Sequence, residues 1–310
     1  MAEAKSLKGL GIEVSASVLN GVCLGADGTI AMTRRKELGD LKSTIERVAE
    51  FVTELKEESG DLDALGVAVP GLIHHETRRV AFSQNIPEHS GVDLANGIQE
   101  ATGLRTVIEN DANAAAYGEF KLGAGRESRD LFYATLGAGI GGAFIFDGSI
   151  WHGKAGFAGE FGFVAINSEG MRLEDVASAS NIVRRTRSRM RQDSTSSLSS
   201  IDESSLTLAD ILSAADVEDD LAKMMLERTG DYVGTAIASV INLLNIETIV
   251  LGGELMEAGN HVLDAVVSRA RELSFGPSFA NTRLLAGALG RNAAAAGAAL
   301  IAGETAAAIR

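Results

Sequence analysis

Glu109-Asn110-Asp111 ends a short apolar run, and a stretch of small residues from Ala112 follows it directly. A strand that leads into a helix in this way places polar side chains at the carboxyl edge of a sheet, where open α/β folds bind ligands. A carboxylate there can orient an alcohol and accept its proton during phosphoryl transfer. Asp111 is therefore the candidate general base. An Asp at this point also commonly caps the following helix, so both roles stay open.

Two glycine-rich segments could bring backbone N–H groups close to phosphate oxygens. Gly137 and Gly139 follow an apolar run that ends at Leu136, and Gly252-Gly253 follows a second apolar run. Because glycine has no Cβ, a ligand can approach its backbone closely, and successive N–H groups form concave anion sites. The structural alternatives are a tight hairpin at the first segment and a strand-to-helix turn at the second.

The N-terminal part of the chain predicts the sheet that would position Asp111. Small and β-branched residues over 9–24 and 29–34, separated by a glycine-containing turn, indicate a β-meander. Helical spacing of apolar residues then alternates with short apolar runs, which is typical of crossovers onto a sheet. The expected order is helix 41–55, strand 65–69, helix 92–102, strand 106–109 and helix 112–122.

A similar order of elements recurs in the second half, although no repeat of letters is visible. Apolar strands over 131–136 and 143–146 flank the glycine run, and a strand over 248–251 follows a long helical stretch. That stretch, 216–244, is expected to break near Gly230. Two further helices are expected after the last strand. The recurrence predicts two related lobes that face a cleft.

The composition narrows the classes of partner. The 310 residues are 45% hydrophobic and carry a net charge of -14, with a pI of about 4.9, so we expect no nucleic acid or membrane partner. Cys23 is the only cysteine, which excludes an intrachain disulfide and a multi-thiolate zinc site. The segment 292–309 is rich in Ala and Gly and predicts a close-packed terminal helix. Residues 1–7 show no secretory signal, so we expect a cytoplasmic protein.

Two polar stretches are expected on the surface. The serine-rich segment 193–205 lacks periodicity and predicts a mobile insertion or connecting loop. Arginines at mostly alternating positions from Arg184 to Arg191 predict a solvated helix face, with a subunit contact or attraction of phosphate as alternatives. Four histidines follow no metal-ligand spacing: His74, His75, His89 and His152.

Five stretches form an ordered set that covers nearly the whole chain. They are Gly66-Val67-Ala68-Val69-Pro70-Gly71, Glu109-Asn110-Asp111-Ala112-Asn113-Ala114-Ala115, residues 136–142, Ala158-Gly159-Glu160-Phe161-Gly162 and Ile249-Val250-Leu251-Gly252-Gly253. In this order they resemble the ROK family of sugar kinases and sugar-responsive repressors. The second and fourth stretches are quite specific to that family.

The resemblance implies an α/β, two-lobed actin-like ATPase (ribonuclease H-like) fold with a cleft between the lobes. It also implies a carbohydrate kinase that uses ATP and Mg²⁺. The lobe with the sugar side and the catalytic base would comprise residues 1–119 and 293–310, and the nucleotide lobe residues 120–292. Because family members are dimers or tetramers, a homo-oligomer is expected.

By the same resemblance, Asp111 is the catalytic base, and Asn110 and Glu160 hold sugar hydroxyls. Glu174 resembles a glutamate that reaches the sugar, although an exposed acid at a helix start is an equal alternative. The sugar-side loop adds two further candidate contacts, Gly71 and Asn85.

On the nucleotide side, Gly137 and Gly139 would approach the ATP phosphates, and Gly252-Gly253 would lie by the adenosine. Family kinases also open with an Asp-x-Gly-Gly-Thr phosphate loop, where this chain has Glu13-Val14-Ser15-Ala16-Ser17. Glu13, Ser15 and Ser17 keep groups that can contact metal and phosphate. Two Cβ atoms now stand where the family has glycine, which weakens the case for efficient ATP turnover.

The zinc motif of the family is also changed. Phe163 has the position of the family's histidine, and residues 167–172 contain no cysteine. Since neither thiolates nor imidazole are present there, no zinc is expected.

Two hypotheses about function follow. The first is an ATP-dependent kinase of a sugar or sugar-like polyol, indicated by Asp111 between candidate ligand loops. The second is a non-catalytic sugar-binding or regulatory protein, indicated by the altered first phosphate loop. A DNA-binding repressor is less favoured, because the predicted sheet begins by about Gly9 and leaves no room for a helix-turn-helix domain before it.

Overall fold

The structure is a computed structural model that describes residues 9–25, 27–38, 43–60, 62–74, 76–193 and 195–308. It contains two compact units. The first comprises Met1–Arg129, Ala143–Ala158 and Ala288–Arg310, and the second comprises Asp130–Gly142 and Gly159–Gly287. His75 and the first two residues of the predicted helix 41–55 lie outside the described residues. The expected lobe boundaries remain a prediction.

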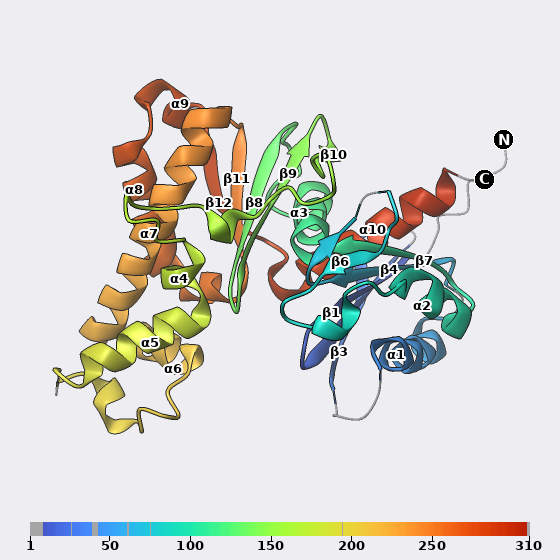
Figure 1. The fold of residues 1–310 in the computed structure, drawn as a ribbon, viewed down its shortest axis with the longest axis horizontal. Coiled ribbons are helices and arrows are strands. Elements are labelled where there is room, and N and C mark those ends of the chain that lie inside the picture. Colours follow the sequence, from blue (N-terminus) through green and yellow to red (C-terminus); the bar gives the residue numbers. More distant parts are fainter. Residues whose placement is uncertain are drawn as a thin grey trace. The chain divides into compact units, whose positions relative to one another are not determined.

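The first unit is built on a five-stranded sheet (Figure 1). Its strands are β1 (Gly9–Val14), β2 (Val18–Leu24), β3 (Ile30–Glu37), β4 (Ala64–Val69) and β7 (Arg105–Asn110), in the spatial order β3-β2-β1-β4-β7. β2 pairs antiparallel with β1 and β3, whereas β4 pairs parallel with β1 and β7. The predicted meander and the strands after it are confirmed.

Helices cover both faces of this sheet. On one face, α1 (Thr44–Ser59) and α2 (Leu94–Thr102) share an apolar core with Leu10 of β1. On the other face lie α3 (Asp111–Leu122) and α10 (Ala293–Ala307), which also contact each other (Figure 1). The strand β7 therefore delivers its last residues directly to the start of α3.

The terminal helix α10 packs close to its neighbours because glycines face it. A Cβ on Gly11 of β1 would stand 1.8 Å from a carbonyl oxygen of α10, and one on Gly66 of β4 would stand 1.9 Å from another. On the side of α3, a Cβ on Gly297 would meet the carbonyl oxygen of Ala114 at 1.7 Å. The prediction of a close-packed terminal helix is confirmed, with backbone against backbone on two sides.

The second sheet has the order β10-β9-β8-β11-β12. Its strands are β8 (Leu131–Leu136), β9 (Ile140–Phe146), β10 (Ser149–Ile150), β11 (Thr248–Gly252) and β12 (Arg283–Ala286). β9 begins before its predicted start, because it continues through Gly141 and Gly142, residues that weaken a strand signal. β12 was not predicted, because its apolar run of three residues is short and the chain after β11 was assigned to helices.

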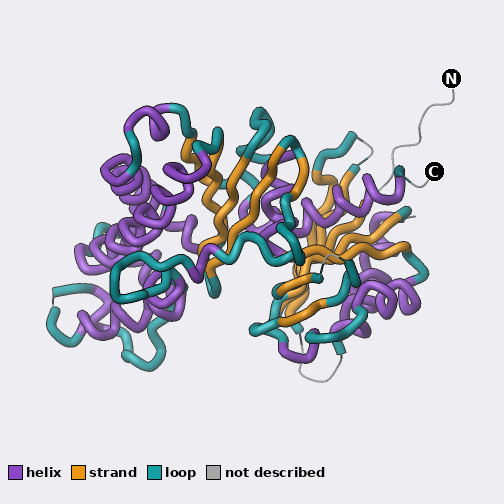
Figure 2. Tube along the Cα trace, turned by 45° about the horizontal axis from the view of Figure 1, so that its top comes forward, coloured by secondary structure: helices purple, strands orange, loops and turns teal. Residues whose placement is uncertain are grey.

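Helices make up much of the rest of the second unit (purple in Figure 2). They are α4 (Glu174–Ala177), α5 (Ala179–Met190), α6 (Leu208–Asp216), α7 (Asp220–Leu244), α8 (Asn260–Leu273) and α9 (Gly276–Ala280). The predicted break near Gly230 is wrong, because α7 is continuous there. Gly230 instead permits close packing of α8, since a Cβ would stand 2.6 Å from that of Ala265. Among the described residues, no helix combines the length and apolarity needed to cross a bilayer.

The serine-rich segment is tied to its neighbours by hydrogen bonds. Asp219, the N-cap of α7, accepts hydrogen bonds from the hydroxyls of Ser196 and Ser197. Arg187 of α5 donates to the backbone carbonyl of Ser204. Part of the arginine-rich face therefore braces this segment rather than only facing solvent. The mobility expected for 193–205 stays a prediction.

Candidate active site

Asp111 is the first residue of α3, and Asn110 caps that helix. Asn110 Oδ1 accepts a hydrogen bond from the N–H of Asn113 at 3.0 Å. Asp111 Oδ1 accepts from the N–H of Ala112 at 2.9 Å and from Asn110 Nδ2 at 3.0 Å. The alternative in which Asp111 is the helix cap is therefore wrong. The general-base role of this carboxylate stays a prediction.

Asn110 also binds the segment that follows β4. Its Nδ2 donates to the carbonyl oxygen of Gly71 at 3.0 Å. Gly71 has φ of 120°, and a Cβ there would stand 2.5 Å from the carbonyl oxygen of Phe82, so the position requires glycine. Two of the predicted sugar-side residues are thus in direct contact.

Asn85 lies in the loop between β6 (Val80–Phe82) and the short 3-10 helix η1 (Pro87–His89). The hydroxyl of Ser83 shapes this loop by donating to the carbonyl oxygen of Pro70 at 2.9 Å. Asn85 itself is exposed. The loop packs back on the segment before Gly71, and a sugar contact by Asn85 stays a prediction.

Glu13, near the end of β1, lies close enough to Asp111 for the two carboxylates to repel each other. Burial, and then the charge of Asp111, raise the pKa of Glu13 to about 7, against the opposing effects of Asn20 and Arg35. Two carboxylates in such proximity favour a shared proton or a bound cation. The predicted metal-side residue and the predicted base are therefore brought together.

Ser15 closes the turn between β1 and β2. Its hydroxyl donates to the carbonyl oxygen of Val18 at 3.0 Å and accepts from the N–H of the same residue at 3.0 Å. Ser17 is exposed in this turn. The Ser15 hydroxyl, predicted to contact phosphate, is thus engaged by the turn itself.

In the second unit, Gly137 and Gly139 form the turn between β8 and β9. Gly137 N–H donates to the carbonyl oxygen of Gly139 at 3.1 Å, which confirms the hairpin geometry. Glu174 at the start of α4 accepts from the N–H of Ile140 at 2.9 Å and holds this turn. Glu174 is an acid at a helix start, as its alternative proposed, but it is partly buried rather than exposed. Phosphate binding by the turn stays a prediction.

Glu160 lies close to Glu174, directly before the short 3-10 helix η2 (Phe161–Phe163). Burial raises the pKa of Glu160, and the nearby charge of Glu174 raises it further. The two acidic residues predicted for sugar hydroxyls therefore lie together. They are also next to the glycine turn, since a Cβ on Gly139 would stand 3.5 Å from Glu174 Oε2.

Phe163 is 54% exposed and is covered by a cation. The guanidinium of Arg172 lies 4.9 Å from the centre of the Phe163 ring and pairs with Asp175 at 2.8 Å. A backbone bridge between Ala165 and Arg172 closes a short hairpin between these residues. In the part of the chain that the structure describes, no group of three or more His, Cys, Asp or Glu could hold a metal ion.

Gly252 and Gly253 pack directly on β8. A Cβ on Gly252 would stand 2.2 Å from the hydroxyl of Tyr133. Gly253 has φ of 90°, and a Cβ there would stand 2.4 Å from the carbonyl oxygen of Leu136. The short 3-10 helix η4 (Glu254–Ala258) follows. The strand-to-helix turn is confirmed, whereas the adenosine contact stays a prediction.

The pairing of Glu109 with His152 was not predicted from the sequence. Glu109 Oε2 lies 2.9 Å from His152 Nε2, and Glu109 Oε1 accepts from Asn113 Nδ2 at 3.0 Å. Burial raises the pKa of Glu109, but hydrogen bonds and the charge of His152 outweigh burial and hold that pKa below its usual value. The only signal in the sequence is that Glu109 directly precedes Asn110.

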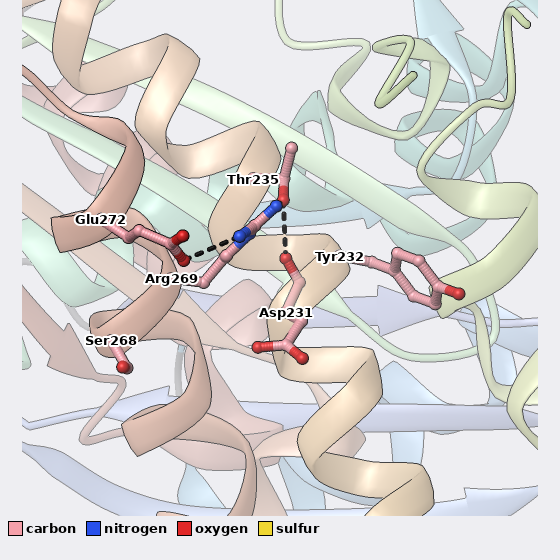
Figure 3. A pocket seen from close by; sticks show the side chains of 6 residues that line it. All are labelled: Asp231, Tyr232, Thr235, Ser268, Arg269 and Glu272. Carbon is pink, nitrogen blue, oxygen red and sulfur yellow. Dashed lines mark hydrogen bonds and ion pairs between the residues drawn. The ribbon is translucent and has the colours of Figure 1, made fainter. Parts of the chain in front are cut away.

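A polar hollow on α7 and α8 contains none of the predicted site residues (Figure 3). Arg269 donates there to Thr235 Oγ1 and to Glu272 Oε2, so its charge is already paired within the hollow. The lining residues are Asp231, Tyr232, Thr235, Ser268, Arg269 and Glu272. We assign this hollow no part in the site.

The fold and the arrangement of these residues define a two-lobed α/β protein of the actin-like ATPase type. The structure is similar to that of a ROK family glucokinase from Streptomyces griseus in complex with glucose and AMPPNP. The TM-score is 0.84 at 24% identity, covering 96% of this chain and 99% of that one. The sequence model of the ROK family matches residues 9–305, and the chain belongs to the ROK family.

Relatives in the family carry two kinds of name. A glucokinase from Thermotoga maritima is 31% identical over 285 residues, which cover 87% of this chain and 86% of the relative. A xylose repressor from Bacillus subtilis is 27% identical over 302 residues, covering 93% of this chain and 75% of the relative. The relatives of this chain therefore include proteins named as a sugar kinase and proteins named as a repressor.

Proposed function

We propose that this protein is an ATP-dependent kinase that phosphorylates a hydroxyl group of a sugar or sugar-like polyol. The observation that carries the proposal is Asp111 at the first turn of α3, where Asn110 has taken over the capping role. Its carboxylate has one oxygen oriented by Asn110 and Ala112. The glucokinase names among the relatives support the same activity.

In this mechanism, Asp111 accepts the proton of the attacking hydroxyl while that oxygen bonds to the γ-phosphorus of ATP. The bond from that phosphorus to the bridging oxygen breaks, and ADP leaves with the electron pair. Glu160 and Glu174 accept hydrogen bonds from other sugar hydroxyls. The turn at Gly137 and Gly139 receives the phosphates of the nucleotide.

Glu13 fits the magnesium ion that accompanies ATP. Its carboxylate is partly buried, and burial and the charge of Asp111 raise its pKa. A nearby cation would favour the ionised forms of both Glu13 and Asp111. Mg²⁺ is commonly held by one or two carboxylates together with substrate phosphates and water. When bound, the ion neutralises charge on the transferring phosphoryl group.

The substitution Asp111→Asn tests the base. It keeps the size of the side chain but removes the proton acceptor, so phosphoryl transfer should fall by about 100-fold or more. Sugar binding, measured by calorimetry, should persist. The matched control is Asp93→Asn at the N-cap of α2, where asparagine caps equally well and activity should not change. Full phosphorylation by the Asp111→Asn variant would rule out this base.

A non-catalytic sugar-binding or regulatory protein is the second candidate. The turn after β1 favours it, because the Ser15 hydroxyl is engaged by Val18 and Ala16 replaces a glycine of the family's phosphate loop. Calorimetry with ATP and Mg²⁺ separates the two candidates. Tight sugar binding without nucleotide binding would identify a regulator.

The substrate itself is best found by a screen. ADP release is measured against a panel of hexoses, amino sugars and cyclitols, with the Asp111→Asn variant as the blank. The proposal includes a cytoplasmic enzyme and a dimer or tetramer, as the family resemblance implies. Cell fractionation tests the location, and light scattering tests the number of subunits.

A further inference from the structure

The Glu109 carboxylate joins two segments of the first unit. Oε1 accepts hydrogen bonds from the side chain of Asn113 at 3.0 Å and from the N–H of Asn110 at 2.9 Å, which fixes the turn from β7 into α3. Oε2 bonds to His152 Nε2 at 2.9 Å. One carboxylate therefore connects the turn that presents the candidate base to the segment 151–158.

The segment around His152 is folded on itself. The N–H of Ala158 donates to the carbonyl oxygen of His152 at 3.2 Å, and two glycines with positive φ allow this turn. Phe157 packs edge-on against the ring of His74, at 6.2 Å between ring centres. Glu160 follows Ala158 after a single glycine. The contact with Glu109 therefore anchors this segment within the first unit.

Folding stability alone does not account for this ion pair. The side chain of Glu109 is 13% exposed and that of His152 is 26% exposed. Removing both charges from water offsets much of their attraction, so partly buried pairs often add little net stability. The alternative explanation for a pair at this depth is geometric: it fixes the two segments that it joins.

We propose that Glu109 and His152 are positioning residues, whose ion pair holds the turn that presents Asp111 to the sugar against the segment 151–158 of the same unit. Neither residue touches the reacting atoms. This inference rests on the proposed phosphorylation of a sugar. It adds that the contact has its full strength, as an ion pair, only while His152 carries its second proton; the neutral ring keeps at most a weaker hydrogen bond to Glu109.

The charges around His152 set the pH range of the pair. The hydrogen bond to Glu109 raises the pKa of His152, whereas burial and the charge of Arg78 oppose that rise. Glu13, near the end of β1, and Asp111, directly after β7, are further carboxylates at this end of the sheet. The pair is present below the raised pKa of His152 and is lost as pH rises through it, above the usual histidine value of about 6.5. On the acid side, it persists until pH falls through the lowered pKa of Glu109.

Trp151 provides a test that needs no substrate. It is the only tryptophan, it is 51% exposed, and it directly precedes His152. We expect its fluorescence to change in a transition above about pH 6.5 in the wild-type protein. The transition should be absent in His152→Gln and present in the control His261→Gln on α8. This experiment stands even if the protein phosphorylates no sugar.

Kinetics provide the second test. His152→Gln and Glu109→Gln should raise the KM for the sugar by about 10- to 100-fold and leave the KM for ATP unchanged. The loss of kcat/KM for the sugar at high pH should be absent in His152→Gln. If Glu109→Gln fails to fold, the His152 variant carries the test, because it leaves the carboxylate in place. A His152→Gln protein with the wild-type fluorescence titration and the wild-type sugar KM would overturn the proposal.

Discussion

Glu13 and Asp111 illustrate how a site can oppose folding stability at the scale of single residues. The pKa of Glu13 is about 7 in the folded protein, compared with 4.5 for an ordinary glutamate. Between these values the folded state binds more protons than the unfolded state, so stability falls as pH rises. The difference corresponds to a cost of about 3 kcal/mol once Glu13 is ionised.

The substitution Glu13→Gln should therefore stabilise the protein at high pH. At about pH 8 we expect a gain on the order of 1–3 kcal/mol in the free energy of unfolding, shrinking as pH falls towards about 4.5. Urea denaturation at several pH values measures it. Glu37→Gln at the exposed end of β3 is the control and should show no such pH dependence. A Glu13→Gln variant no more stable than wild type at about pH 8 would contradict the raised pKa of Glu13.

Asp111 and Asn110 are adjacent residues, and either type could cap α3. Both Asp and Asn are good helix caps, so the sequence alone left the capping of α3 open. The structure decides because the Asn110 side chain accepts from Asn113 and donates to both Gly71 and Asp111. The backbone angles of a single residue decide which of two adjacent candidates caps the helix. No sequence pattern specifies those angles.

At the scale of elements, α10 depends on glycines in the strands that it covers. Gly66→Ala would place a Cβ 1.9 Å from a backbone oxygen of α10, so either the helix or β4 must move. We expect a loss of about 1–3 kcal/mol in the free energy of unfolding. Thermal or urea denaturation measures this loss.

Gly303→Ala is the matched control within α10 itself. No atom lies within 4 Å of a Cβ at Gly303, so the change should stabilise the helix by about 0.5–1 kcal/mol. Opposite signs for Gly66→Ala and Gly303→Ala are the expected result. Equal effects would show that the close approach of α10 does not control stability.

Elements with a strong local pattern were predictable, and those fixed by distant contacts were not. The meander and α10 follow from apolar runs and small residues that can be read in one window. Gly230 was misinterpreted as a helix break because its reason, the approach of Ala265 on α8, lies elsewhere in the chain. β12 was not predicted because its four residues give a weak strand signal. It forms a strand by pairing with β11.

The same distinction applies to the candidate site. Asp111 could be found because a strand, an acid and a small-residue helix follow each other directly. The pairing of Glu109 with His152 joins positions 43 residues apart and could not be found, since an isolated histidine has no spacing to interpret. The Ser15 hydroxyl was predicted to be available for phosphate, but its use in the β1–β2 turn depends on the geometry of Val18.

At the scale of the whole molecule, like charges oppose compaction. The chain has 42 acidic and 28 basic residues, which gives a net charge of -14. Surface ion pairs such as Arg34 with Glu58 contribute little against this excess, because solvent screens them. Self-repulsion should therefore weaken the folded state at neutral pH.

Salt should relieve this repulsion in a pH-dependent way. Raising NaCl from about 20 mM to about 200 mM should increase the Tm by a few degrees at about pH 8. Near pH 5 the net charge approaches zero, since the pI is about 4.9, and the increase should vanish. Calorimetric scans at the two pH values measure this. An equal increase at both would indicate a general salt effect instead.

The position of α10 also has a consequence for synthesis of the protein. The strand β1 begins at Gly9 and α10 begins at Ala293, so the ribosome releases the first sheet long before the helix that covers one of its faces. Until then, the glycine-lined face of β1 and β4 has no backbone to pack against. We expect stalled nascent chains that end before Ala293 to be cleaved readily by protease in the first unit, and to become resistant once α10 has emerged.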